Sequence, residues 1–127
     1  MIKVTINGAS GKMGTKVSNL IKNDSSLVEC FDDISCSDLV IDFSQPSSTK
    51  KILKKCVAAK KPIIIGTTGF TNDDLNEIRE AANSIPIVLA ANMSKGIFYL
   101  KKSLASFINN NQDKLRCLIE ETHHLEK

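Results

Sequence analysis

Short apolar runs alternate along this chain with stretches in which apolar residues recur at helical spacing. The helical pattern is clearest where Val17, Leu20 and Ile21 form one stripe between polar neighbours. The nearly continuous apolar runs are typical of buried parallel strands and cover residues 2–6, 27–31, 39–43, 62–65 and 85–90. Strands that alternate with helices predict βαβ units, and therefore an α/β fold whose parallel sheet has helices on both faces.

Two helix starts can be read from the residues that precede them. Residues 44–47 combine small hydroxyl side chains with Pro46, whose fixed φ suits a first helical turn. Thr71 precedes a helical stretch with Asp73 and Asp74 in its first turn, where carboxylates favourably oppose the helix dipole. We therefore expect a hydroxyl cap at both helices.

The link between the second and third predicted strands is short. A helical crossover needs about a dozen residues, and residues 32–38 are too few for one. We therefore expect an extended link and a sheet that lacks one βα unit. Beyond residue 90 the pattern predicts a helix over 97–108, ended by the asparagines at 109–111, and then a strand over 115–121.

A glycine-rich loop joins the first predicted strand to the first helix. Its spacing fits a Rossmann-type βα unit, in which Gly8 permits a tight turn, Gly11 a close approach to pyrophosphate, and Gly14 close helix packing. The segment does not match a Walker loop, which disfavours ATP. The alternative is a glycine turn without a ligand. The residues predicted to bind NADH or NADPH here are Gly8, Ala9, Ser10, Gly11, Lys12 and Met13.

An acidic residue about twenty positions beyond the glycines normally meets the adenosine ribose of a dinucleotide. Asp32 and Asp33 occupy that place, directly after the second predicted strand. A carboxylate there accepts from the ribose 2′-OH and repels a 2′-phosphate, which favours NADH, although Lys12 would partly offset the repulsion. The alternative is a pair of ordinary surface aspartates in a short loop.

Composition and charge exclude several other classes of function. The 127 residues suit a modest globular core, and the net charge of +3, with few aromatic residues, gives no sign of nucleic-acid binding. The lysines of residues 50–61 alternate with apolar residues at helical spacing, which places them on a solvated face. No apolar run approaches the roughly 18 residues of a membrane span, and the start does not resemble an export signal. We therefore expect a cytoplasmic protein.

The cysteines and histidines do not form a metal-binding pattern. Cys30, Cys36, Cys56 and Cys117 are scattered, so we expect reduced thiols packed as small apolar groups, with a disulfide or metal role as the alternative. Adjacent residues of an extended chain point to opposite sides, so the histidine pair near the C-terminus could not easily share one ion. We predict no metal.

Five motifs in order resemble the 4-hydroxy-tetrahydrodipicolinate reductases (dihydrodipicolinate reductases) of bacterial lysine and diaminopimelate biosynthesis. The resemblance spans nearly the whole chain. The motifs are GASGKMG at 8–14, VIDFS at 40–44, GTTGF at 66–70, AANMS at 90–94 and ETHH at 121–124.

This resemblance implies roles that the residue pattern alone does not show. His123 is similar to the family's proton donor, His124 to a residue that contacts substrate, and Lys127 to a lysine that assists protonation. The carbon next to the one that receives hydride must be protonated, and imidazole suits proton donation near neutral pH. A lysine can bind a carboxylate of the small cyclic dicarboxylate substrate. Without the family, the histidines would be a solvated pair. The loops implied to line the nicotinamide contain Gly66, Thr67, Thr68, Ala90, Ala91, Asn92 and Met93; without the family they would be ordinary βα loops.

The resemblance also implies the domain organisation. Residues 1–93 would form the dinucleotide-binding domain, and residues 94–127 the start of an α+β substrate-binding domain that also builds the family's homotetramer. A Lys-x-Asp-x-Pro-Ser-Gly-Thr-Ala stretch expected to grip the substrate is absent. Smaller departures are Lys12 in place of arginine, Met93 in place of phenylalanine, and the short link at 32–38.

Three functions therefore remain open on the sequence. The first is NAD(P)H-dependent reduction of 4-hydroxy-tetrahydrodipicolinate to tetrahydrodipicolinate. The second is a non-catalytic NAD(P)-binding module or a truncated, inactive fragment of such a reductase, because the substrate-gripping stretch is absent. The third is another small NAD-dependent oxidoreductase that reduces a different imine or carbonyl.

Overall fold

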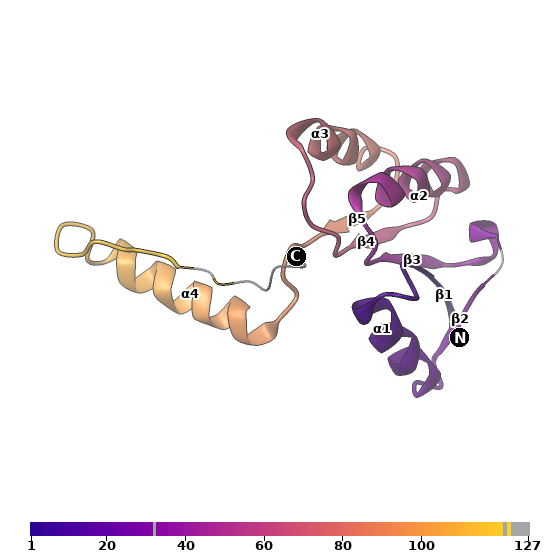
Figure 1. Ribbon diagram of the computed structural model, residues 1–127, viewed down its shortest axis with the longest axis horizontal. Helices are drawn as coiled ribbons and strands as arrows, with labels where there is room; N and C mark the ends of the chain where they lie inside the picture. The colour runs from indigo at the N-terminus through magenta and orange to yellow at the C-terminus, as the bar shows by residue number, and fades with distance from the viewer. Residues whose placement is uncertain (32, 121, 123–127) are drawn as a thin grey trace. The chain divides into compact units, whose positions relative to one another are not determined.

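The computed structural model describes residues 1–31, 33–120 and 122, and the chain divides into two compact units, Met1–Asn92 and Met93–Lys127 (Figure 1). The first unit alternates short strands with helices. Its elements are β1 (Ile2–Asn7), α1 (Lys12–Lys22), β2 (Leu27–Glu29), the 3-10 helix η1 (Ile34–Cys36), β3 (Leu39–Asp42), α2 (Pro46–Ala59), β4 (Ile63–Ile65), α3 (Asn72–Ala81) and β5 (Ile87–Leu89). The second unit contains α4 (Lys95–Asn109).

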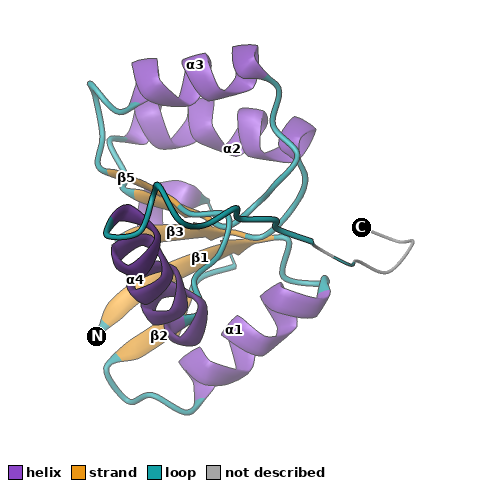
Figure 2. Cartoon of the chain, turned by 90° about the vertical axis from the view of Figure 1, so that its left-hand side faces the viewer, coloured by secondary structure: helices purple, strands orange, loops and turns teal. Residues whose placement is uncertain are grey.

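The five strands form one parallel sheet in the order β2-β1-β3-β4-β5. Helices α2 and α3 cover one face and α1 covers the other (Figure 2). The predicted Rossmann-type α/β fold is therefore confirmed, as is a sheet that lacks one βα unit. The link from β2 to β3 differs from the prediction in one respect, because it contains the single turn η1 and is not extended throughout.

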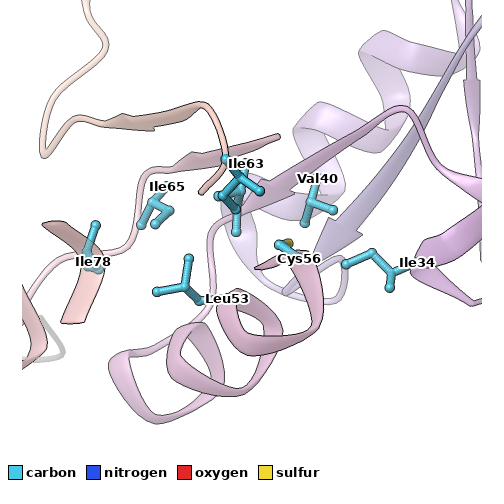
Figure 3. Close-up of a cluster of buried hydrophobic side chains, with 8 residues drawn as sticks. Ile34, Val40, Leu53, Cys56, Ile63, Ile65 and Ile78 are labelled. Atoms are coloured by element: carbon cyan, nitrogen blue, oxygen red, sulfur yellow. The ribbon is translucent and has the colours of Figure 1, made fainter. Parts of the chain in front are cut away.

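Apolar side chains from both sides of the sheet form two cores. On the α2 and α3 side, buried isoleucines of β4 and Val40 of β3 pack with Leu53 and Cys56 of α2 and Ile78 of α3 (Figure 3). On the α1 side, Val4 and Ile6 of β1 pack against Ile21. Each large apolar side chain buried in this way contributes about 1.5–3 kcal/mol to stability.

The two predicted hydroxyl caps have different outcomes. Thr71 caps α3 as predicted: its hydroxyl accepts the Asp74 amide at 3.2 Å, and the Asp74 carboxylate accepts the Thr71 amide at 3.0 Å. The predicted cap at residues 44–47 is wrong, although Pro46 does begin α2. Gln45 is the N-cap and makes no side-chain cap, because the Ser44 hydroxyl instead donates to Asp42.

The lysine-rich face of α2 is solvated as predicted, with one exception. Lys50 is half-buried and its ammonium lies 2.8 Å from Asp74 and 3.1 Å from Glu77 of α3. The Lys50 ammonium, and then the Thr71 amide and hydroxyl, lower the pKa of Asp74 to about 2. The same carboxylates raise the pKa of Lys50. The ion pair therefore joins the two helices that cover this face of the sheet.

This ion pair predicts an acid-sensitive contribution to stability. Because the pKa of Asp74 is lower in the folded chain than its ordinary value of 3.8, its contribution is present above about pH 4 and is lost as the pH falls towards 2. Asp74→Asn should therefore lower the unfolding free energy at pH 7, and the difference from the wild type should shrink below pH 4. Urea unfolding of both proteins at pH 7 and at a pH below 4 measures this difference in unfolding free energy. Asp73→Asn, at an exposed acid of the same turn, is the control, and an equal pH response of both variants would contradict the prediction.

The cysteines depart from the expectation of free thiols. Cys30 and Cys36 form a disulfide across the turn of η1. This pairing could not be anticipated from spacing, because it depends on how η1 folds back beside the end of β2. Cys56 is a buried thiol as expected, and burial raises its pKa to about 11. Cys117 is free and exposed.

In the second unit, α4 follows the predicted helix and ends within the asparagine run. The predicted strand at 115–121 is wrong for residues 115–120, which are neither helix nor strand, and Glu121 lies outside the described residues. A strand needs a partner that supplies hydrogen bonds, and no segment of the described chain provides one there. No helix of the described residues has the length and apolar content of a membrane span.

Candidate functional site

Four strands of the sheet end in one row. The register pairs Asn7 of β1 with Asp42 of β3, Asp42 with Ile65 of β4, and Ile65 with Leu89 of β5. One residue further on, the Phe43, Gly66 and Ala90 amides donate to this row at 2.8–3.0 Å. The loops that follow these strands therefore begin side by side at the carboxyl edge, where open α/β sheets bind ligands.

The glycine loop after β1 forms a cradle at the start of α1. Gly8 has φ +86°, which favours glycine, and a Cβ there would lie 2.6 Å from the Phe43 carbonyl oxygen. A Cβ on Gly14 would lie 2.0 Å from the Gly8 carbonyl oxygen, so α1 approaches the loop as closely as backbone allows. The N-cap Gly11 has no side chain with which to cap the first amides of α1. These features fit a pyrophosphate group.

Phe43 joins this cradle to the loop after β4. Its carbonyl packs against Gly8, and its ring occupies the space that a side chain on Gly66 would need, with the ring 2.1 Å from such a Cβ. The small residues at positions 8 and 66 are therefore both required by the residue that follows β3.

A buried carboxylate lies at the centre of the row. Asp42 is fully buried, and its Oδ1 accepts from the Asn7 amide group at 2.8 Å and from the Ser44 hydroxyl at 2.5 Å. Its Oδ2 accepts from the Thr49 hydroxyl at 2.5 Å and from the Thr67 hydroxyl at 3.0 Å. Asp42 is not among the site residues predicted from the sequence, although a charged residue in an otherwise apolar strand is a signal that could have identified it.

The structure describes one of the two candidate ribose-binding acids. Asp33 is exposed at the start of η1, where its carboxylate accepts from the Ser35 hydroxyl at 3.1 Å. It follows β2, which neighbours β1 in the sheet. Asp32 lies outside the described residues.

The predicted nicotinamide loops follow neighbouring strands, β4 and β5. Thr68 is exposed, whereas Thr67 is only 5% exposed and its hydroxyl donates to Asp42. Thr67 can therefore offer a ligand its backbone but not its hydroxyl. Ala90, Ala91 and Asn92 end the first unit, and Met93 belongs to the second.

The predicted catalytic and substrate residues, His123, His124 and Lys127, lie outside the described residues. In the described part of the chain, no group of three or more histidine, cysteine or acidic side chains could hold a metal ion. A groove of about 480 Å³ lies between α2 and α3 and contains none of the predicted site residues.

The chain resembles known reductases along its whole length. It is 32% identical to a 4-hydroxy-tetrahydrodipicolinate reductase of Clostridium tetani over 100% of this chain and 57% of the relative. It is 35% identical to the enzyme of the same name from Alkaliphilus oremlandii over 96% of this chain and 54% of the relative. The chain therefore spans about half the length of the curated relatives it matches.

A solved structure shares the fold. The dipicolinate-bound dihydrodipicolinate reductase from Paenisporosarcina sp. TG-14 matches 85% of this chain and 53% of its own, with a TM-score of 0.66 and 23% identity. A family model described as dihydrodipicolinate reductase, N-terminus, matches residues 24–93, more than half of the chain. The chain therefore belongs to the dihydrodipicolinate reductase family and matches its N-terminal part.

Proposed function

We propose that this chain is the dinucleotide-binding part of an NAD(P)H-dependent 4-hydroxy-tetrahydrodipicolinate reductase. The observation that carries the proposal is the glycine cradle at the row of strand ends, in a member of this family. Residues 1–93 would bind the nucleotide, and residues 94–127 would begin the substrate-binding domain. The cytoplasmic location and the homotetramer expected from the family stay predictions.

The cradle suits the pyrophosphate for a physical reason. The first amides of α1 carry partial positive charge. No side chain separates these amides from an anion at the three glycine positions, Gly8, Gly11 and Gly14. Lys12 is exposed at the first position of α1 and can approach a phosphate as a point charge. The pyrophosphate-binding residues would be Gly8, Ala9, Ser10, Gly11, Lys12 and Met13.

The adenosine end would lie beside Asp33, and Asp32 would share this role. An exposed carboxylate accepts from a ribose 2′-OH and repels a 2′-phosphate, so we propose a preference for NADH. Asp33→Asn should narrow the affinity difference between NADH and NADPH about fivefold, and calorimetry with both nucleotides measures it. Asp73→Asn makes the same charge change away from the site and should leave the ratio unchanged. An unaltered ratio of NADH to NADPH affinity in Asp33→Asn would show that Asp33 does not contact the ribose.

The nicotinamide end would lie against Gly66 to Thr68 and Ala90 to Met93. Bound NADH or NADPH would supply a hydride for a cyclic dicarboxylate whose 4-hydroxyl group leaves as water. We propose that His123 donates the proton that completes the reduction, with Lys127 assisting it and His124 contacting substrate; the support for these roles is the family resemblance. Imidazole suits proton transfer near neutral pH.

A second candidate function is that of a non-catalytic NAD(P)-binding module, or a fragment without turnover. The described residues support it, because they contain the pyrophosphate cradle and none of the proposed catalytic residues. The two functions differ in whether a substrate analogue affects nucleotide binding.

Calorimetric titration of the chain with NADH and with NADPH tests both. Each titration is repeated with pyridine-2,6-dicarboxylate, a stable analogue of the proposed substrate. We expect nucleotide binding, strengthened by the analogue if the substrate site works. Nucleotide binding that ignores the analogue favours the non-catalytic module, and no binding of either nucleotide overturns the proposal.

A further inference from the structure

Asp42 connects the loops on both sides of β3. Its Oδ1 accepts a hydrogen bond from the side chain of Asn7, the residue directly before Gly8. Its Oδ2 accepts one from the hydroxyl of Thr67, the residue directly after Gly66. The remaining donors come from Ser44, by its hydroxyl and its amide, and from Thr49 of α2. One fully buried carboxylate therefore gathers five hydrogen bonds from the last residue of β1, from the loops after β3 and β4, and from helix α2.

The partners of Asp42 are also bonded to one another. The Thr67 hydroxyl accepts the Ser44 amide at 3.0 Å, and the Asn7 side chain donates to the Ser44 hydroxyl at 2.9 Å. Buried hydrogen bonds to a carboxylate are stronger than neutral ones and hold their donors in fixed positions. The network thus fixes the distance between the loop after β1 and the loop after β4.

We propose that Asp42 is a positioning residue that sets the spacing between the pyrophosphate cradle and the Gly66–Thr68 loop. The inference rests on the proposed function, because it concerns a nucleotide that bridges the two loops. A displacement of about 1 Å between groups that hold one ligand can cost orders of magnitude in rate, so a buried clamp at this point has a function beyond folding.

Two threonines that donate to the same oxygen separate positioning from folding. Thr67→Val removes the hydroxyl that ties the Gly66–Thr68 loop, whereas Thr49→Val removes the hydroxyl that ties α2. Both changes keep the shape of a buried side chain and leave Asp42 Oδ2 short of one donor. Thr67→Val also removes the acceptor of the Ser44 amide, so the two variants are compared by a ratio of two ligand affinities and not by their stability.

The test compares binding of NADH with binding of ADP-ribose, which keeps the adenosine and pyrophosphate but lacks the nicotinamide. Thr67→Val should weaken NADH binding about tenfold and leave ADP-ribose binding within about twofold, because it removes the hydroxyl that ties the Gly66–Thr68 loop to Asp42 and to the Ser44 amide. Thr49→Val should leave the ratio of the two affinities unchanged. Thr67→Ser retains the hydroxyl and should restore the wild-type ratio.

Each other outcome has one meaning. An unchanged ratio of the two affinities in Thr67→Val, with or without a loss of both, overturns the positioning role and leaves the proposed function standing. Failure of the wild-type chain to bind either ligand overturns the proposed function. If Thr67→Val does not fold, Thr67→Ala removes the same hydroxyl without adding a buried methyl group, and the same ratio decides the question.

Discussion

Gly14→Ala is expected to abolish NADH binding and to lower the melting temperature by about 10 °C or more. The added Cβ would lie 2.0 Å from the Gly8 carbonyl oxygen and 2.7 Å from the Ala9 Cα, and neither is the movable end of a side chain. Helix α1 can accept the methyl group only by moving away from the cradle, which displaces the amides proposed to hold the pyrophosphate. Circular dichroism and calorimetric titration measure the two effects.

Two other glycines calibrate this result. A Cβ on Gly11 would lie 3.3 Å from the same carbonyl oxygen, so Gly11→Ala should lower the melting temperature less than Gly14→Ala does. A Cβ on Gly96 of α4 would lie 3.7 Å from its nearest neighbour, the Ser94 hydroxyl oxygen, and Gly96→Ala should leave NADH affinity unchanged. Retention of NADH binding in Gly14→Ala would show that close packing of α1 is unnecessary for the site.

The elements that the sequence predicts correctly depend on local signals. Gly8, Gly11 and Gly14 mark a strand, a turn and a helix within a few residues, and Thr71 with Asp74 forms a reciprocal cap that needs no other part of the chain. The short link before β3 also predicts the missing βα unit, because chain length limits what a link can contain. Local signals of this kind survive because the tertiary structure agrees with them.

The failures have a different cause, since each depends on a three-dimensional contact that the residue pattern does not specify. Ser44 has the chemistry of a helix cap, but the buried Asp42 takes its hydroxyl and holds it in the strand-end network. Residues 115–120 have a strand pattern but no neighbouring strand in the described chain. The role of Asp42 itself becomes visible only when register aligns it with Asn7. A one-dimensional pattern contains none of these contacts.

Gly66→Ala is expected to lower the unfolding free energy by about 2–3 kcal/mol and to weaken NADH at least tenfold, because overpacking a fitted site forces its neighbours to move. The new Cβ would lie 2.1 Å from Cε1 of Phe43 and within 2.8 Å of two further ring atoms. The obstacle is a side chain, so the cost should depend on Phe43. This dependence distinguishes the variant from Gly14→Ala, where backbone atoms obstruct the methyl group.

A double-mutant cycle measures the dependence. Phe43→Ala alone removes the ring and destabilises the chain. In that background, Gly66→Ala should lower the unfolding free energy by about 1–3 kcal/mol less than it does in the wild type. Gly69 is the matched control in the same loop: it has φ +86° and nothing within 4 Å of an added Cβ, so Gly69→Ala incurs only backbone strain. Its cost should be the same with or without the Phe43 ring. Additive effects of Gly66→Ala and Phe43→Ala on the unfolding free energy would mean that the Phe43 ring does not pack against Gly66. The contact between the residue after β3 and the loop after β4 would then be absent.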